Sequence, residues 1–245
     1  MTDTIEGRNP VIEALKAGRA ISRILLSRDV GRHSTIAEIL HLAQANGVHV
    51  EFVPRSIIDN ASQTPANQGV IAYTAARDYV DLEYLLRVSA EKGEPPLYCI
   101  LDGIEDPQNF GAILRTVDAS GTHGVIIRSR RAVGLTAAVA KASAGAVEYV
   151  PVARVVNISQ AIETLKRNNV WVVGIDPAGK TPHTRVDFKA PTAIVIGNEG
   201  SGISELVLKH CDLVVSIPMR GKIASLNAST AAAVVMYEAL RQRTL

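Results

Sequence analysis

Cysteine is scarce in this chain of 245 residues, which argues against a fold held together by disulfide bonds or by cysteine-bound metal. The two cysteines, Cys99 and Cys211, each stand inside an apolar run, LYCIL and HCDLVV. Thiols in such runs are typical of buried, reduced side chains rather than of a disulfide framework or a metal site. We therefore expect a cytoplasmic protein that folds on a hydrophobic core and binds no metal.

Long apolar runs and a strong net charge are also missing. No run approaches the roughly 18 apolar residues that span a bilayer, and the first residues, MTDTIEGRNP, do not resemble a signal peptide. We therefore expect neither membrane insertion nor secretion. Lys and Arg total 26 against 24 Asp and Glu, so the net charge of +2 does not by itself identify a nucleic-acid-binding protein.

The first 75 residues predict a small α/β domain. Helical spacing of apolar residues predicts helices over 10–17 and 34–45, and the runs ISRILLS, VHVEFV and QGVIAY predict strands. Residues 76–96 contain a charged helical pattern and end on the breaker GEPP, which indicates a linker. We therefore expect an N-terminal domain over 1–75 and a second domain over 97–245.

The second domain predicts a mostly parallel sheet covered by helices on both faces. Continuous apolar runs alternate there with helical patterns, as buried parallel strands do in α/β proteins. These runs are LYCILD, GVIIRS, VWVVGID, TAIVIG and LVVSIP. Sheets of this kind bind ligands beyond the carboxyl ends of their strands.

A nucleotide-binding pattern occurs at residues 174–181. GIDPAGKT matches the phosphate-loop pattern G-x-x-x-x-G-K-[ST] and follows a predicted strand. Phosphate binding requires a helix to begin at Lys180, yet the spacing of Thr184, Val186 and Phe188 predicts extended chain instead. We favour a surface turn, and an ATP-binding protein stays open as a second interpretation.

Three polar segments follow predicted strands, where this architecture binds ligands. They are DPQNFGAILRT (106–116), GNEGSG (197–202) and IPMRGKIASLNAS (217–229). Each alone has an ordinary explanation, because Arg115 is a polar residue opposite an apolar helical face, glycines form turns, and Asn227 is a good helix cap. Their joint occurrence indicates a binding site.

Together the segments resemble the three motifs of the SpoU (TrmH-like) family of RNA ribose 2'-O-methyltransferases. The matching residues are Asn109-x-Gly-Ala-Ile-x-Arg115-Thr, Gly197-Asn-Glu-Gly, and Ile217-Pro-Met followed by Ser225-Leu-Asn. GRNPVIEAL and NQGVIAY are similar to the family's N-terminal substrate-binding domain, which has a ribosomal-protein-like fold. KASAGAVEYVPVARVVN is similar to a subfamily that methylates a guanosine in the peptidyl-tRNA-binding loop of 23S ribosomal RNA.

The resemblance implies a trefoil knot of the SPOUT type, the cofactor S-adenosyl-L-methionine, and a homodimer whose interface lies beside the active site. It assigns three residues to the methyl donor: Gly197, Ile217 and Leu226. It assigns five residues to catalysis and ribose binding: Asn109, Arg115, Glu199, Ser225 and Asn227.

The resemblance also implies that Arg115 acts as the base. Because arginine stays protonated in proteins, we interpret Arg115 instead as a cation that stabilises the developing alkoxide and grips a phosphate. Further basic residues suggest a path for RNA. They are Arg8, Arg19, Arg23, Arg28, Arg32, Arg128, Arg130, Arg131, Arg220 and Lys222. The same features are compatible with a tRNA ribose methyltransferase and with a non-catalytic RNA-binding protein.

Overall fold

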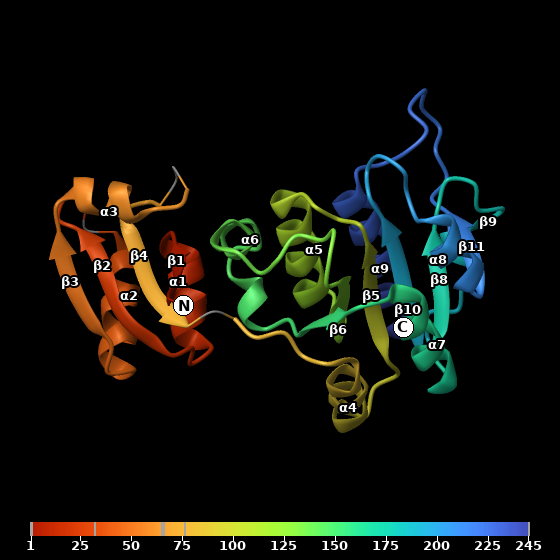
Figure 1. Ribbon diagram of the computed structural model, residues 1–245, viewed down its shortest axis with the longest axis horizontal. Coiled ribbons are helices and arrows are strands. Elements are labelled where there is room, and N and C mark those ends of the chain that lie inside the picture. The colour runs from red at the N-terminus through yellow and green to blue at the C-terminus, as the bar shows by residue number, and fades with distance from the viewer. Residues whose placement is uncertain (1, 32, 65–66, 76, 245) are drawn as a thin grey trace. The chain divides into compact units, whose positions relative to one another are not determined.

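The computed structural model describes residues 2–31, 33–64, 67–75 and 77–244, and their contacts form two compact units. Unit 1 comprises Met1–Asp78 and Gly134–Tyr149, and unit 2 comprises Tyr79–Val133 and Val150–Leu245. Figure 1 shows that each unit is built on its own sheet. Arg32, one of the basic residues noted above, lies outside the described residues.

Unit 1 contains a four-stranded sheet among its described residues. Its strands lie in the order β1 (Thr2–Glu6), β4 (Val70–Ala75), β2 (Ile21–Ser27) and β3 (His49–Val53). β2 and β3 are parallel, and the other neighbours are antiparallel. Its three longer helices are α1 (Arg8–Lys16), α2 (Ser34–Ala45) and α3 (Arg55–Ala61).

The helices of unit 1 pack on both faces of this sheet. Apolar residues of α1 and α2 join those of one face in a single core, whereas Ile58 of α3 packs with Leu25 and Ile71 on the other face. The predicted bounds of α2 are confirmed, because its apolar spacing and the Asn-Gly pair that ends it are local signals. β1 and α3 were not predicted.

Residues 134–149 also belong to unit 1, although the sequence suggested a domain boundary near residue 75. They contain α6 (Ala137–Ala142) and the short 3₁₀ helix η1 (Ala146–Glu148). Glu148 accepts hydrogen bonds from Arg19 (2.7 Å) and from Arg77 (2.8 Å), and its side chain is only 2% exposed. Ion pairs between residues so distant in sequence produce no local sequence pattern, so this part of unit 1 could not be predicted from the sequence.

Unit 2 contains a seven-stranded sheet among its described residues, and every neighbouring pair of strands in it is parallel. Its order is β7 (Val152–Val155), β6 (Gly124–Arg128), β5 (Leu97–Asp102), β10 (Thr192–Gly197), β8 (Trp171–Ile175), β11 (Leu213–Ser216) and β9 (Thr181–Pro182). The strand order reverses between β5 and β10. Such a reversal directs neighbouring loops apart and leaves a crevice between them.

Helices cover both faces of the unit 2 sheet, which confirms the predicted α/β architecture (Figure 1). One core joins the sheet to α4 (Leu82–Lys92), α7 (Ile158–Arg167) and α8 (Glu205–His210). On the other side, α5 (Pro107–Ala119) packs against α9 (Ala228–Arg243). The expected linker helix, α4, is therefore part of unit 2, because Leu85 is buried in its core.

The segment that resembles a phosphate loop is not followed by an α-helix. The residues after Lys180 form the short strand β9 and the 3₁₀ helix η2 (His183–Arg185), so the extended chain expected over this stretch is only partly present. Gly179 has a packing role, because a Cβ there would lie 2.4 Å from the carbonyl carbon of Val215. The glycine of the pattern therefore allows β11 to approach closely.

Both cysteines are free thiols. Burial raises the pKa of the Cys99 thiol, and it is the main cause that raises the pKa of Cys211 to about 11. At neutral pH both side chains therefore stay protonated. Within the described part of the chain, no helix combines the length and apolarity needed to cross a membrane.

Glu148→Gln tests the buried ion pairs of unit 1. The substitution leaves Arg19 and Arg77 without their counter-charge, and we expect it to lower the free energy of unfolding by about 3 kcal/mol. Glu38→Gln is the matched control, because Glu38 pairs with Lys16 at the surface, where loss of an ion pair should change the free energy of unfolding far less. Urea unfolding measures both. Equal losses in the two variants would contradict this role of Glu148.

Candidate functional site

The candidate site lies where the strand order of unit 2 reverses. Asp102 at the end of β5 pairs with Gly197 at the end of β10, so the segments that follow these strands begin side by side. One segment leads into α5 and the other is the loop over residues 198–204. The segments that follow β8 and β11 reach the same place, because all these strands are parallel.

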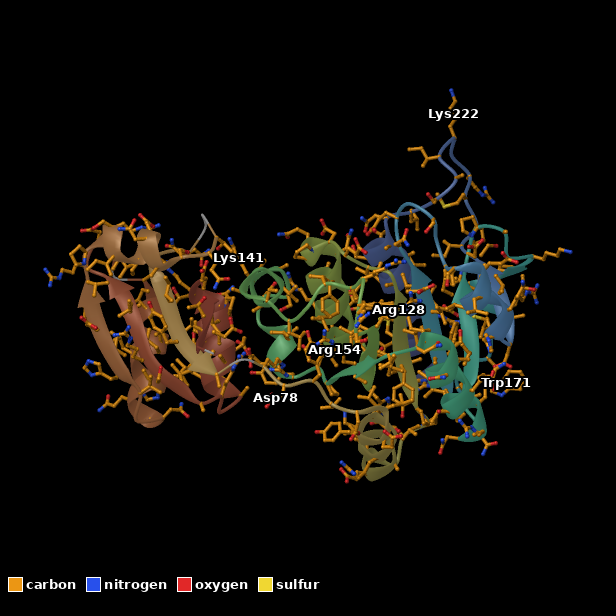
Figure 2. All side chains as sticks on the ribbon, viewed as in Figure 1. Asp78, Arg128, Lys141, Arg154, Trp171 and Lys222 are labelled. Atoms are coloured by element: carbon orange, nitrogen blue, oxygen red, sulfur yellow. The ribbon has the colours of Figure 1, made fainter. Side chains whose placement is uncertain are left out.

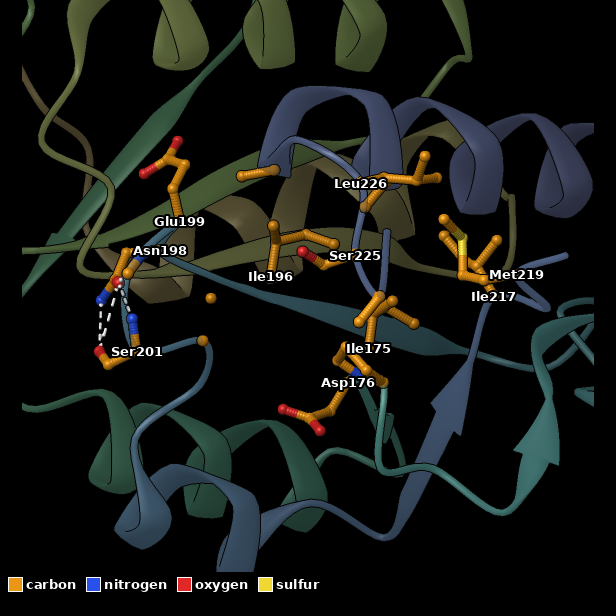
Figure 3. A pocket seen from close by; sticks show the side chains of 17 residues that line it. Ile175, Asp176, Ile196, Asn198, Glu199, Ser201, Ile217, Met219, Ser225 and Leu226 are labelled. Carbon is orange, nitrogen blue, oxygen red and sulfur yellow. Dashed lines mark hydrogen bonds between the residues drawn. The ribbon is translucent and has the colours of Figure 1, made fainter. Parts of the chain in front are cut away.

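A cavity of about 290 Å³ opens between these segments. Figure 3 shows the polar side chains of Asn198, Glu199 and Ser201 at one end and the apolar side chains of Ile217, Met219 and Leu226 at the other. Ligand pockets for small molecules have volumes of about 300–1,000 Å³ and mainly apolar walls with a few polar groups. The size and lining therefore suit a molecule of roughly nucleoside size.

The loop after β10 folds tightly on itself. The Oδ1 atom of Asn198 accepts hydrogen bonds from the backbone N–H groups of Gly200 (2.9 Å) and Ser201 (2.8 Å). The backbones of Asn198 and Gly202 also bond to each other in both directions. A Cβ on Gly197 would lie 2.1 Å from the backbone of Gly202, so this close return requires glycine. The tightly folded loop, residues 198–202, lines the cavity.

A chain of side-chain hydrogen bonds joins three segments of the site. Asn109 of α5 donates through Nδ2 to the Oε1 atom of Glu199. Asn227 donates through its own Nδ2 to the Oδ1 atom of Asn109, at 2.9 Å. The Oδ1 atom of Asn227 meanwhile caps α9 by accepting from the backbone N–H of Ser229. The residues that begin α5 and α9 thus fix the carboxylate of Glu199.

Most of the site residues inferred from the sequence lie at this cavity or bond to a residue that lines it. Five of them line it: Gly197, Glu199, Ile217, Ser225 and Leu226. Asn109 and Asn227 join it through Glu199. Arg115 does not: its exposed side chain makes no hydrogen bond or ion pair with the described residues, and it follows Asn109 by about 9 Å along the axis of α5.

Sequence reasoning missed the contribution of the segment that follows β8. Asp176 and Pro177 line the cavity, although the pattern containing them was interpreted as a surface turn. The turn is present, because the backbone N–H of Gly179 donates to the carbonyl of Asp176. Its position after a parallel strand was the signal that could have placed it at the site.

Comparison with known proteins identifies the family. The profile of the SpoU rRNA Methylase family matches residues 96–237, and a profile described as RNA 2'-O ribose methyltransferase substrate binding matches residues 4–80. The chain belongs to the SpoU rRNA methylase family. The inferred resemblance is therefore confirmed, and the three segments that build the cavity fall within the matched methylase region.

Relatives of this SpoU family protein match over nearly its whole length. It is 43% identical to YacO of Bacillus subtilis (strain 168), named as a TrmH family tRNA/rRNA methyltransferase, over 98% of this chain and 96% of that protein. A relative of the same description from Staphylococcus saprophyticus is 47% identical over 98% and 95%. The crystal structure of the SpoU methyltransferase AviRb from Streptomyces viridochromogenes in complex with the cofactor AdoMet has a TM-score of 0.80 and 27% identity, covering 99% and 91%.

Gly197→Ala tests the close return of the loop after β10. The added Cβ would overlap the backbone of Gly202, so the loop must open, and we expect a loss of about 2 kcal/mol or more in the free energy of unfolding. Gly200→Ala is the matched control in the same loop, because its Cβ would meet only the Oδ1 atom of Asn198 at 3.5 Å. Urea unfolding compares the two. Similar stability of both variants would contradict the described geometry.

Proposed function

We propose that the protein transfers a methyl group from S-adenosyl-L-methionine to a ribose 2'-hydroxyl of RNA, and that its target is a guanosine in the peptidyl-tRNA-binding loop of 23S ribosomal RNA. The observation that carries the proposal is the cavity lined by Glu199, whose carboxylate is bonded to Asn109 and, through Asn109, linked to Asn227. The AviRb complex supports the choice of cofactor, since that protein has a similar fold and is described with AdoMet.

The lining of the cavity fits such a methyl donor. Gly197, Ile217 and Leu226 contribute backbone and apolar surface against which an adenine ring packs, and Asp176 offers a carboxylate to ribose hydroxyls. When bound, S-adenosylmethionine supplies an electrophilic methyl group. Because Gly197 has no side chain, the loop returns close to the end of β10, and its residues line the cavity that would hold the donor.

The remaining site residues hold the acceptor. One oxygen of Glu199 is occupied by Asn109, and the other is free to accept a hydrogen bond from the ribose hydroxyl. Ser225 lines the same cavity and Asn227 is linked to Glu199 through Asn109, so both are further polar groups for the ribose. The guanidinium of Arg115 would stabilise the negative charge that develops on the ribose oxygen during methyl transfer.

Because Arg115 does not line the cavity, its guanidinium can contact the reacting hydroxyl only when another molecule binds over the site. We infer a homodimer, since large apolar side chains are exposed near the site and on α9: Ile223 is 74% exposed and Tyr237 is 50% exposed. Large exposed apolar side chains of this kind are frequent where proteins associate. A second copy over this face, together with RNA, would enclose Arg115.

Three further properties belong to the proposal. The chain leaves β11 and returns through residues 217–227 to α9, which packs against α5, and we propose that this return forms a trefoil knot. Residues 1–75 serve as an RNA-recognition domain with a ribosomal-protein-like fold, supported by the substrate-binding profile over residues 4–80. The protein acts in the cytoplasm during ribosomal RNA processing.

A single incubation distinguishes the substrates. Purified protein, labelled methyl donor, and separated ribosomal RNA and tRNA are combined, and the labelled nucleoside is identified after digestion. We expect 2'-O-methylguanosine in 23S RNA. Label in tRNA alone would favour a tRNA ribose methyltransferase. No label in any RNA, with the donor still bound, would favour a non-catalytic RNA-binding protein.

Titration calorimetry tests the ligand of the cavity. S-adenosylmethionine should bind, and ATP should not, because no helix follows Lys180 to direct amide groups at phosphates. Lys180→Ala should leave donor binding unchanged, since Lys180 does not line the cavity. Tight ATP binding that Lys180→Ala abolishes would overturn the assignment.

Arg115→Ala tests the charge-stabilising role. The exposed side chain can be removed without unfolding the protein, so the variant should dimerise and bind the donor normally. Turnover should fall by about 10²–10³, as when one donor to a developing oxyanion is removed. Arg115→Lys keeps the positive charge but removes the planar guanidinium with its paired N–H donors. Rescue of turnover by lysine would therefore favour simple charge stabilisation, and no rescue would favour a role for the guanidinium geometry. Near-normal turnover of Arg115→Ala would show that Arg115 has no role in catalysis.

A further inference from the structure

We propose that a second cavity, next to the first, holds the target nucleotide, and that Arg128 and Arg131 bind the phosphates that flank its ribose. This inference rests on the proposed function and deepens it, because it assigns a place and two binding residues to the RNA. Both arginines belong to unit 2, and Arg128 is labelled in Figure 2.

The two cavities share one wall. The second cavity has a volume of about 540 Å³, and Asn198, Glu199 and Ser201 line both. Methyl transfer by in-line displacement requires the reacting atoms to approach within about 3–3.5 Å. A nucleotide therefore has to occupy space that borders the donor cavity at Glu199, and the second cavity is such a space.

Arg128 is held rigidly at the end of β6. Its Nη2 atom donates to the Oδ1 atom of Asp102 at 2.9 Å, and Asp102 is buried. The other oxygen of Asp102 accepts from the backbone N–H (2.9 Å) and the hydroxyl (2.6 Å) of Ser204. Because a guanidinium has five N–H donors, Arg128 retains several that contact none of the described residues. Such a fixed fork matches the oxygens of a phosphate.

Arg131 stands in a backbone conformation that non-glycine residues rarely adopt. Its φ is +55°, in the left-handed region, and its exposed side chain has no hydrogen bond or ion pair among the described residues. Backbone strain of this kind clusters at ligand-binding positions. Arg131 thus adds a second, unengaged cation to a cavity that already contains Arg128.

The carboxylates of this cavity favour a nucleotide over a free anion. Asp102 is neutralised by Arg128, Asp106 caps α5, and Glu199 is bonded to Asn109. These acceptors, together with the exposed Glu105, suit the hydroxyl and N–H groups of a nucleoside, whereas the two arginines suit phosphates. A nucleotide within an RNA chain presents both kinds of group.

Arg128→Gln and Arg131→Gln test the assignment. Each should weaken binding of the RNA substrate by about fivefold to tenfold and lower the slope of log K against log salt concentration by about one, the result of one lost phosphate contact. KM for RNA should rise more than kcat falls, and the dissociation constant for S-adenosylmethionine should not change. Arg167→Gln is the matched control, because it removes the same charge from the exposed face of α7.

The outcomes separate this inference from the proposed function. If the unsubstituted protein methylates no RNA, the proposed function itself fails. If it does methylate RNA, and both variants bind RNA with the affinity and salt slope of Arg167→Gln, the nucleotide does not lie in this cavity. Should Arg128→Gln unfold because Asp102 loses its partner, Arg131→Gln decides alone, since Arg131 bonds to no buried carboxylate among the described residues.

Discussion

The parallel pairing of β5 with β10 is the constraint on which the site depends. The two strands lie far apart in the chain, yet their pairing sets Asp102 beside Gly197 at the point where the strand order reverses. Asp102 then uses both carboxylate oxygens to hold Arg128 and Ser204, which belong to two other segments. A single buried and fully paired carboxylate thereby fixes the loops around both cavities.

Helix capping and the site share the same side chains. Asp106 caps α5 and bonds to the backbone of Asn109, and Asn227 caps α9 while donating to the side chain of Asn109. Stability and positioning are therefore coupled, because a residue that begins a helix also orients the neighbour of Glu199. This coupling explains why ordinary cap residues occur within the family motifs.

The segment 174–181 shows how a sequence pattern takes its meaning from its surroundings. Its letters match a phosphate loop, but phosphate binding depends on a helix that begins at the lysine, and the chain instead forms β9 and η2. Gly179 makes room for Val215, and Asp176 lines the cavity of the candidate site. In this chain the same residues therefore allow close packing of β11 and line the candidate cavity.

Local patterns in the sequence determined the alternation of strands and helices, the bounds of α2, and the three segments that build the site, because periodicity and caps depend on residues near one another in the chain. Only the tertiary structure decided that η1 pairs with the N-terminal unit through Glu148, that Asp176 enters the cavity, and that Asn227 bonds to Asn109. Each of these facts depends on residues brought together by folding. Contacts across more than a hundred residues, such as that of Glu148 with Arg19, have no periodic signature in the sequence.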